Sequence, residues 1–242
     1  NVLIADTENT AAGISCRSVK FKEQTYVFYT ERFPDAPHVL SPPMEITTNS
    51  KGYLRLAYSG YSELLRSNQI IYPKKVPEVA DLPIPTHQWP IHSGTWESDG
   101  YSLFGQAKNG WQIAYLDSEA ENLEIIADIK LDAVAAGIVL NIDNYGNIVF
   151  MLDSEKKAVI STNTPAFQLS HIRHWDIFNN NEYNLRIIKR GRRFEVYVDN
   201  LLALGFFEDI PCDKNARIGF IIDRDNTTIS ELNVFELRKN NY

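Results

Sequence analysis

The chain has 242 residues, of which 44% are hydrophobic, and its formal net charge is −7. This length exceeds the usual size of one domain and provides enough apolar residues for a sizeable core. The acidic balance argues against a broad nucleic-acid-binding surface, because phosphate backbones bind basic stripes. The sequence contains no run of about 18 apolar residues, so no membrane span is predicted.

Residues 1–69 predict a small β module. Period-two alternation indicates strands on both sides of a polar turn at 23–24 and again around a turn at 49–52. The proline-rich segment 33–43 is expected to be neither strand nor helix, because proline removes a hydrogen-bond donor. Residues 59–69 predict one short helix with Leu64 and Leu65 facing inward. These strands are too few to bury a core alone, so the module needs more sheet beside it.

Residues 70–92 predict a connector. They contain five prolines with apolar residues between them, a composition that favours an extended segment lying against a surface. We therefore expect a domain boundary here, between a module at 1–69 and a second domain at 93–242.

Residues 93–242 predict about ten short strands with almost no helical period between them, which indicates an all-β sandwich or barrel. The clearest element is a β-hairpin over 183–200, in which Leu185, Ile187, Phe194, Val196 and Val198 alternate with polar residues. Its turn, 189–193, carries four basic residues and one glycine. We interpret this turn as a solvated hairpin tip.

Four segments of the second domain resemble the concanavalin A-like (laminin-G-like) jelly-roll β-sandwich. They are the opening GTWESDGYSL, the pair ENLEIIADIKL and AGIVLNID, the hairpin RIIKRGRRFEVYVDN, and the closing ARIGFIIDRDNTTISELNVFEL. The resemblance covers about 150 residues and implies the fold alone, because this superfamily includes lectins, hydrolases and spacers.

The first module resembles the closing blade of the five-bladed propeller of glycoside hydrolase family 32, in which a linker then leads into a jelly-roll sandwich. Leu40 to Glu45 stand where that family has Leu-Pro-Arg-Glu-Leu, and Tyr61 to Leu64 stand where its ending helix begins. The family's Asp-Pro-Asn, Arg-Asp-Pro and Glu-Cys catalytic motifs are absent from this sequence. The resemblance therefore implies a non-catalytic, carbohydrate-associated module that binds a glycan or supports a hydrolase.

Two alternatives remain open: a glycoside hydrolase acting in the sandwich groove, and an adhesion or protein-interaction module. The expected partner is an oligo- or polysaccharide, such as a fructan or a plant glycan, with no nucleic acid and no membrane span. We expect a secreted, periplasmic or cell-surface protein, because the chain begins at Asn1 without Met, as a trimmed mature protein would.

The candidate carbohydrate-binding residues are His171, His174, Trp175, Asp176 and Tyr145. In a sugar site, Trp175 would stack on a ring while His174 and Asp176 bind hydroxyls, and Tyr145 would present an aromatic ring at a turn. The alternative for the first four is a loop pinned to the core by Trp175 and Ile177, and the alternative for Tyr145 is a packed aromatic. On a strand, the two histidines lie on opposite faces, so we expect no metal site there.

No cofactor is expected, and no catalytic residue is nominated. The loop acids at 97, 99, 117, 119, 223 and 225 are interpreted as solvated turn residues, although the run 223–226 offers the best oxygen set for calcium. Cys16 and Cys212 show no metal-ligand spacing; one bridge between them and two free thiols remain open.

Overall fold

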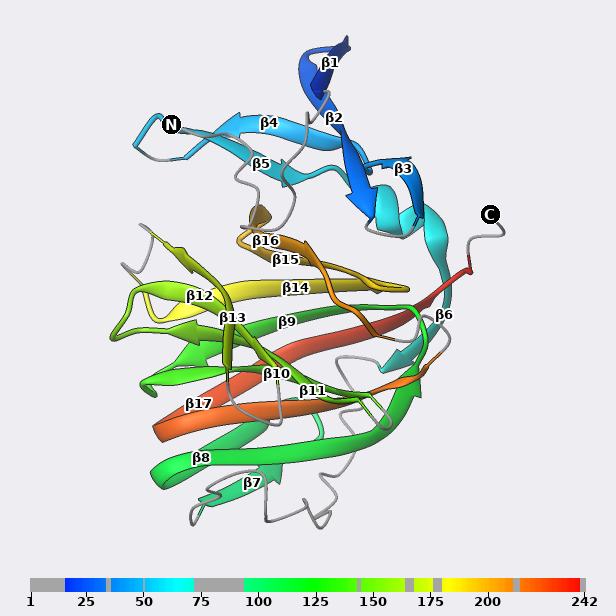
Figure 1. Ribbon diagram of the computed structural model, residues 1–242. Coiled ribbons are helices and arrows are strands. Elements are labelled where there is room, and N and C mark those ends of the chain that lie inside the picture. The colour runs from blue at the N-terminus through cyan, green and yellow to red at the C-terminus, as the bar shows by residue number, and fades with distance from the viewer. Residues whose placement is uncertain are drawn as a thin grey trace.

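The computed structural model describes residues 16–33, 36–49, 51–71, 94–142, 145–163, 168–175, 180–210 and 214–239 (Figure 1). Within these ranges the chain forms seventeen strands, all paired antiparallel, and one 3-10 helix, η1. The elements are β1 (Cys16–Phe21), β2 (Gln24–Phe33), β3 (Ala36–Leu40), β4 (Met44–Thr48), β5 (Leu54–Tyr58), η1 (Tyr61–Leu65), β6 (Arg66–Ile71), β7 (Gly94–Ser98), β8 (Leu103–Ala120), β9 (Leu123–Leu131), β10 (Ala135–Ile142), β11 (Gly146–Asp153), β12 (Ala158–Asn163), β13 (Gln168–His174), β14 (Glu182–Arg190), β15 (Arg193–Val198), β16 (Leu201–Phe207) and β17 (Ala216–Leu237). The predicted all-β sandwich is confirmed.

The long strand β17 belongs to both layers of the sandwich. Its first part pairs with β8 and with β10, and β10 continues through β11 and β12 to β13. Its last part pairs with β9, which continues through β14 and β15 to β16. The register shifts between Asp223 and Asp225, where Arg224 and Asp225 have left-handed backbone angles of 53° and 64°. Such a bulge bends a strand, which lets one strand serve two sheets.

The main core lies between these two layers. Phe150 of β11 packs against Phe194 of β15 and Phe206 of β16, with ring centroids 5.7 and 6.2 Å apart. Alternate residues of each strand face inward, as the period-two pattern predicted. Each such buried side chain contributes roughly 1.5–3 kcal/mol of stabilisation, so this core is the main source of the sandwich's stability.

The N-terminal module, β1 to β5, lies above the outer face of β14, β15 and β16 (Figure 1). A separate apolar cluster joins them, in which Val27, Met44 and Leu56 of the module share buried contacts with Ile188 and Tyr197 of the sandwich. The outer face of the second layer is therefore an interior surface, which answers the sequence-based expectation that the module needs more sheet beside it.

Two expectations for the N-terminal module were wrong in part. The proline-rich segment contains β3, and among the strands that the structure describes β2 is its one ladder partner. Such an edge strand tolerates proline because one of its sides needs no donor. The expected helix is only the single turn η1, and Leu64 is 81% exposed. Ser62 is the fully buried residue of this turn instead, and the chain then continues as β6, which pairs with β17.

The hairpin over 183–200 is confirmed as β14 and β15, but its basic tip is only partly solvated. Lys189 has no exposed surface, and its Nζ donates to the backbone carbonyl oxygens of Glu121 and Lys214. The Arg193 side chain is 11% exposed and pairs with buried Glu195. Two of the four basic residues are therefore structural. Among the residues described, no helix is long and apolar enough to cross a membrane.

Candidate functional site

An open pocket of about 490 Å³ lies where the N-terminal module meets the sandwich. Its walls come from β4, β5 and η1 on one side, and from β14 and the turn into β16 on the other. The lining residues are Glu45, Thr47, Ala57, Tyr58, Gly60, Glu63, Arg186, Asn200 and Leu201. The pocket therefore needs both parts of the chain to exist.

A minimal strand contact holds the two walls together. Leu201 of β16 pairs with Ala57 of β5, and the backbone N–H of Tyr58 donates to the carbonyl of Asn200 at 2.8 Å. Gly60 then has a φ of 82°, a left-handed angle that glycine adopts without strain and that turns the chain into η1. This turn brings Ser62 and Glu63 beside β14.

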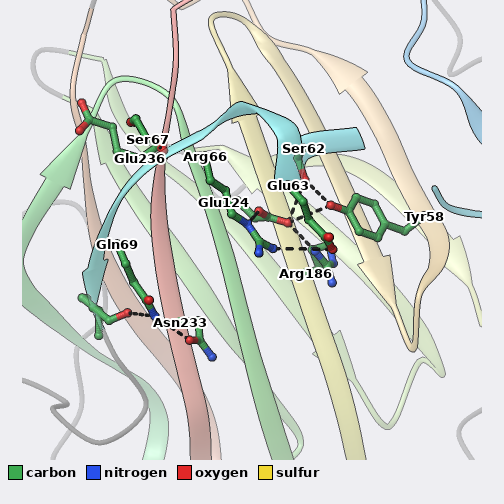
Figure 2. A network of polar contacts seen from close by, with 11 residues as sticks. Tyr58, Ser62, Glu63, Arg66, Ser67, Gln69, Glu124, Arg186, Asn233 and Glu236 are labelled. Carbon is green, nitrogen blue, oxygen red and sulfur yellow. Dashed lines mark hydrogen bonds and ion pairs between the residues drawn. The ribbon is translucent and has the colours of Figure 1, made fainter. Parts of the chain in front are cut away.

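A fully buried carboxylate, Glu124 of β9, organises the polar residues behind the pocket (Figure 2). Ser62 Oγ donates to its Oε1 at 2.9 Å, Arg66 Nε donates to its Oε2 at 2.7 Å, and Arg186 Nη1 donates to its Oε1. Burying a charge is costly unless it is paired and hydrogen-bonded. Here η1 and β6 supply part of that pairing, so Glu124 joins the module to the sandwich.

Arg186 carries this network to the pocket surface. Its guanidinium lies 3.8 Å from the centroid of the Tyr58 ring, a cation–π contact, and the residue is 9% exposed. Its Nε is buried and has no hydrogen-bond partner. Burial raises the pKa of the Tyr58 hydroxyl, whose oxygen lies 2.5 Å from Ser62 Oγ. Tyr58 therefore stays a neutral phenol at physiological pH.

A second buried carboxylate, Glu195 of β15, supports the same turn. Tyr61 and Tyr197 both donate their hydroxyl hydrogens to Glu195 Oε2, at 2.7 and 2.6 Å, and Arg193 Nη2 lies 2.7 Å from Oε1. Burial, followed by the charge of Glu195, raises the pKa of both tyrosines well above the usual value. This cluster anchors η1 without lining the pocket.

Two of the five sequence-predicted site residues meet at a different place. His171 Nε2 lies 3.7 Å from Glu208 Oε1, and the Tyr145 hydroxyl donates to Glu208 Oε2 at 3.4 Å. The His171 ring also packs on Phe206, with centroids 4.0 Å apart. Burial, and then the charge of Glu208, raises the pKa of Tyr145 to about 12. These contacts close the sandwich edge between β13 and β16.

The other three residues do not join that group. His174 is exposed and lies on the face of β13 opposite to His171, as the strand period required. Trp175 is 3% exposed and belongs to the main core, so its ring offers no exposed stacking face. The residues before it form the strand β13 and not the pinned loop of the alternative, whose second anchor, Ile177, lies outside the described residues. Asp176 lies outside the described residues, as does Cys212, whereas Cys16 is an exposed free thiol.

Neither the residues that line the pocket nor the buried network behind it was predicted from the sequence. Glu124 stands in the apolar run LEIIADIKL and Arg186 in LRIIKR. A charge at the outward position of an otherwise apolar strand is a signal that the outer face is covered by another element. That signal was present, but it names no partner, because Ser62 and Tyr58 lie more than sixty residues away in sequence.

The pocket combines hydrogen-bond acceptors, donors and an aromatic ring. Glu45 and Glu63 offer acceptor oxygens, the guanidinium of Arg186 offers donors, and Asn200 offers both. In the described part of the chain, no three His, Cys, Asp or Glu side chains gather closely enough to hold a metal ion. The arrangement suits a ligand rich in hydroxyl groups.

No protein-family model matches the sequence, and a search of curated proteins found no match. Solved structures do share the fold. The carbohydrate-binding module CBM66 from Bacillus subtilis has a TM-score of 0.53 at 15% identity, over 60% of this chain and 92% of that chain. A Bacillus subtilis protein of unknown function with a galectin-like fold has a TM-score of 0.52 at 9% identity, over 72% and 99% of the two chains.

The longest overlap among the structures described here is with a mutant of the Bombyx mori GH32 β-fructofuranosidase in complex with sucrose. The TM-score is 0.55 at 11% identity, over 93% of this chain and 40% of that chain. At such low identities these likenesses show the fold, an antiparallel β-sandwich as in the C-terminal region of GH32 enzymes and in galectin-like proteins. The chain spans less than half the length of the β-fructofuranosidase.

Proposed function

We propose that this chain is a non-catalytic carbohydrate-binding protein and that the pocket between the N-terminal module and the sandwich holds its glycan. One observation carries the proposal. A buried guanidinium with an unpartnered Nε, a tyrosine ring and two carboxylates line the same open pocket. Sites for small polar ligands are built from a few such convergent groups on a largely preformed wall.

The chemistry of sugars fits these groups. Each hydroxyl group donates one hydrogen bond and accepts others, so carboxylates and guanidinium groups side by side can satisfy neighbouring hydroxyls. The structural neighbours support this class of ligand, since one is a carbohydrate-binding module and another holds sucrose. We propose a fructan or a plant glycan as the natural partner.

The order of small β module, connector and sandwich supports a family 32-like origin, with the module at 1–69 as the counterpart of a closing propeller blade. We propose that the chain acts outside the cytoplasm, at the place where polysaccharides occur. Cell fractionation with an antibody against the sandwich tests this location. Recovery of the protein only in the cytosol would contradict it.

A second candidate function is glycoside hydrolysis in the same pocket. Glu45 and Glu63 both line it, and a glycosidase requires two carboxylates in one cleft. Glu45 is bound by Gln24 Nε2 at 3.2 Å, and Glu63 lies 4.0 Å from Arg66. Both carboxylates therefore have polar neighbours, and these contacts are equally consistent with a role in binding alone.

One experiment separates the two functions. Residues 1–242 are tested against fructans and plant glycans, with binding and reducing-sugar release measured in parallel. The proposal predicts binding without release. Release that is abolished in both Glu45→Gln and Glu63→Gln would establish the hydrolase and contradict the proposal. An absence of binding to every glycan would contradict both and leave the protein-interaction alternative.

A further inference from the structure

We infer that Arg186 is the specificity-determining donor of the pocket, and that Glu124, by neutralising it, makes the pocket select uncharged sugars over acidic ones. This inference rests on the proposed function and deepens it to a ligand class. It assigns Arg186 a direct role and Glu124 a positioning role.

The first step is the state of the Arg186 guanidinium. Nη1 is committed to Glu124 and one face of the group is stacked on Tyr58, whereas the buried Nε has no partner. Nε is closed off from the pocket, but Arg186 lines it, so the remaining Nη hydrogens are the donors that a ligand oxygen can reach.

The second step is the orientation of the group. Arg186 is held from one side by Glu124, which has no exposed surface, and Glu124 is in turn held by Ser62 and Arg66. A guanidinium fixed in this way loses little freedom when a ligand binds, so the donor is preorganised. Glu124 does not line the pocket, and it acts on the ligand only through Arg186.

The third step is the charge around the pocket. Three carboxylates, Glu45, Glu63 and Glu124, face two guanidinium groups, Arg66 and Arg186, which leaves a surplus of one negative charge. A uronate or sulfate would find no uncompensated positive charge here and would be repelled by Glu45 and Glu63. A neutral sugar can accept from Arg186 and donate to the carboxylates.

The test measures equilibrium binding of inulin, levan and arabinan as neutral probes, and of polygalacturonate as the acidic probe. Arg186→Lys keeps the charge but removes the planar guanidinium fork, and we expect at least about tenfold weaker binding of the neutral probes. Arg193→Lys is the matched control, because Arg193 is equally buried and also pairs with a buried glutamate, but it does not line the pocket.

Glu124→Gln tests the positioning role. Removing this charge leaves Arg186 uncompensated, so the ratio of polygalacturonate to neutral-probe affinity should rise about tenfold or more, a change that loss of stability alone would not produce. If this variant does not fold, Glu63→Gln tests the same charge relationship from the 53% exposed rim of the pocket.

The outcomes test the inference about Arg186 separately from the proposed function. The inference is supported if the wild-type chain binds the neutral probes, Arg186→Lys weakens that binding and Arg193→Lys retains it. The inference is overturned, and the proposed function still stands, in any of three cases. These are unchanged binding in Arg186→Lys, an unchanged affinity ratio of the two probe classes in the glutamate variants, and a wild-type preference for polygalacturonate. A wild-type chain that binds no probe overturns the proposed function and the inference together.

Discussion

Arg186 and Glu124 form an ion pair inside the protein, with Glu124 fully buried and Arg186 only 9% exposed. Removing one partner of such a pair typically costs about 3–5 kcal/mol, because the other charge is left buried and unpaired. The pair therefore fixes the wall of the pocket, and residues from the module complete its hydrogen bonds.

Ser62→Ala should lower the free energy of unfolding by about 1.5–3 kcal/mol, the range for a hydrogen bond to a charged group. Ser62 is fully buried and bonds to Glu124. Denaturant unfolding measures the loss. Ser67→Ala is the control: its exposed hydroxyl donates to a backbone carbonyl at 3.1 Å, and its loss should stay within about 0.5 kcal/mol. Equal losses in both variants would contradict the prediction.

Gly219→Ala should destabilise the sandwich by about 1–3 kcal/mol. A Cβ at Gly219 would lie 2.5 Å from Tyr115 Cδ1 and 2.7 Å from the Ala114 carbonyl oxygen, so the Tyr115 ring must move. Gly205→Ala is the matched control, because its Cβ would meet no atom closer than 4.0 Å. We expect it to be neutral or up to about 1 kcal/mol stabilising. Thermal unfolding of the two variants checks the contrast.

Asp199→Asn should stabilise the protein slightly at pH 7 and not at pH 3. Partial burial of its carboxyl raises the Asp199 pKa above the ordinary 3.8. The folded state thus holds the proton more tightly, so stability is greatest below pH 3.8 and falls as pH rises through the raised pKa. Asn keeps the acceptor for Asn184 N–H and tolerates the φ of 50°.

Because Asp199 sits at an exposed turn, the gain at neutral pH should be no more than about 0.5 kcal/mol. The midpoint of thermal unfolding, measured from pH 3 to pH 7 for both proteins, tests the sign. A wild-type protein that gains stability relative to Asp199→Asn as the pH rises would show that the carboxylate is favourably placed.

Glu208→Gln should lower the pKa of Tyr145 from about 12 while leaving it above 10. Burial is the larger cause of the raised value and persists in the variant; only the negative charge 3.4 Å from the hydroxyl is lost. Ultraviolet difference titration against Tyr145→Phe isolates this tyrosine from the others. A Tyr145 pKa that Glu208→Gln leaves unchanged would contradict the contact with Glu208.

The fold could be read from the sequence because strand alternation is local. The hairpin from Leu185 to Val198 carries its own pattern and turn, and its pairing followed directly. The strand β3 was missed because its segment contains prolines, which are excluded from central strands but tolerated at the edge of a sheet. Whether a strand lies at an edge depends on the tertiary structure and not on the local sequence. The burial of Lys189 also depends on tertiary structure, because its ammonium group donates to backbone carbonyls of segments that are distant in sequence.

The pocket could not be read in this way. Its two walls are separated by more than a hundred residues, from Tyr58 to Arg186, and one residue pair between β5 and β16 brings them together. Trp175 drew attention because aromatic residues in loops bind sugars, but the sequence does not state which face of β13 continues into the core. The same residue type serves both roles, and burial decides between them.

The most direct test of the account fills the pocket. Thr47 lines it from β4, whereas Thr48 is exposed on the opposite face of the same strand, so Thr47→Trp and Thr48→Trp add the same side chain on and off the site. Isothermal titration with the tightest-binding neutral glycan should show affinity reduced at least about tenfold in Thr47→Trp and unchanged in Thr48→Trp. Wild-type affinity in a folded Thr47→Trp variant would contradict the assignment of this pocket as the glycan site.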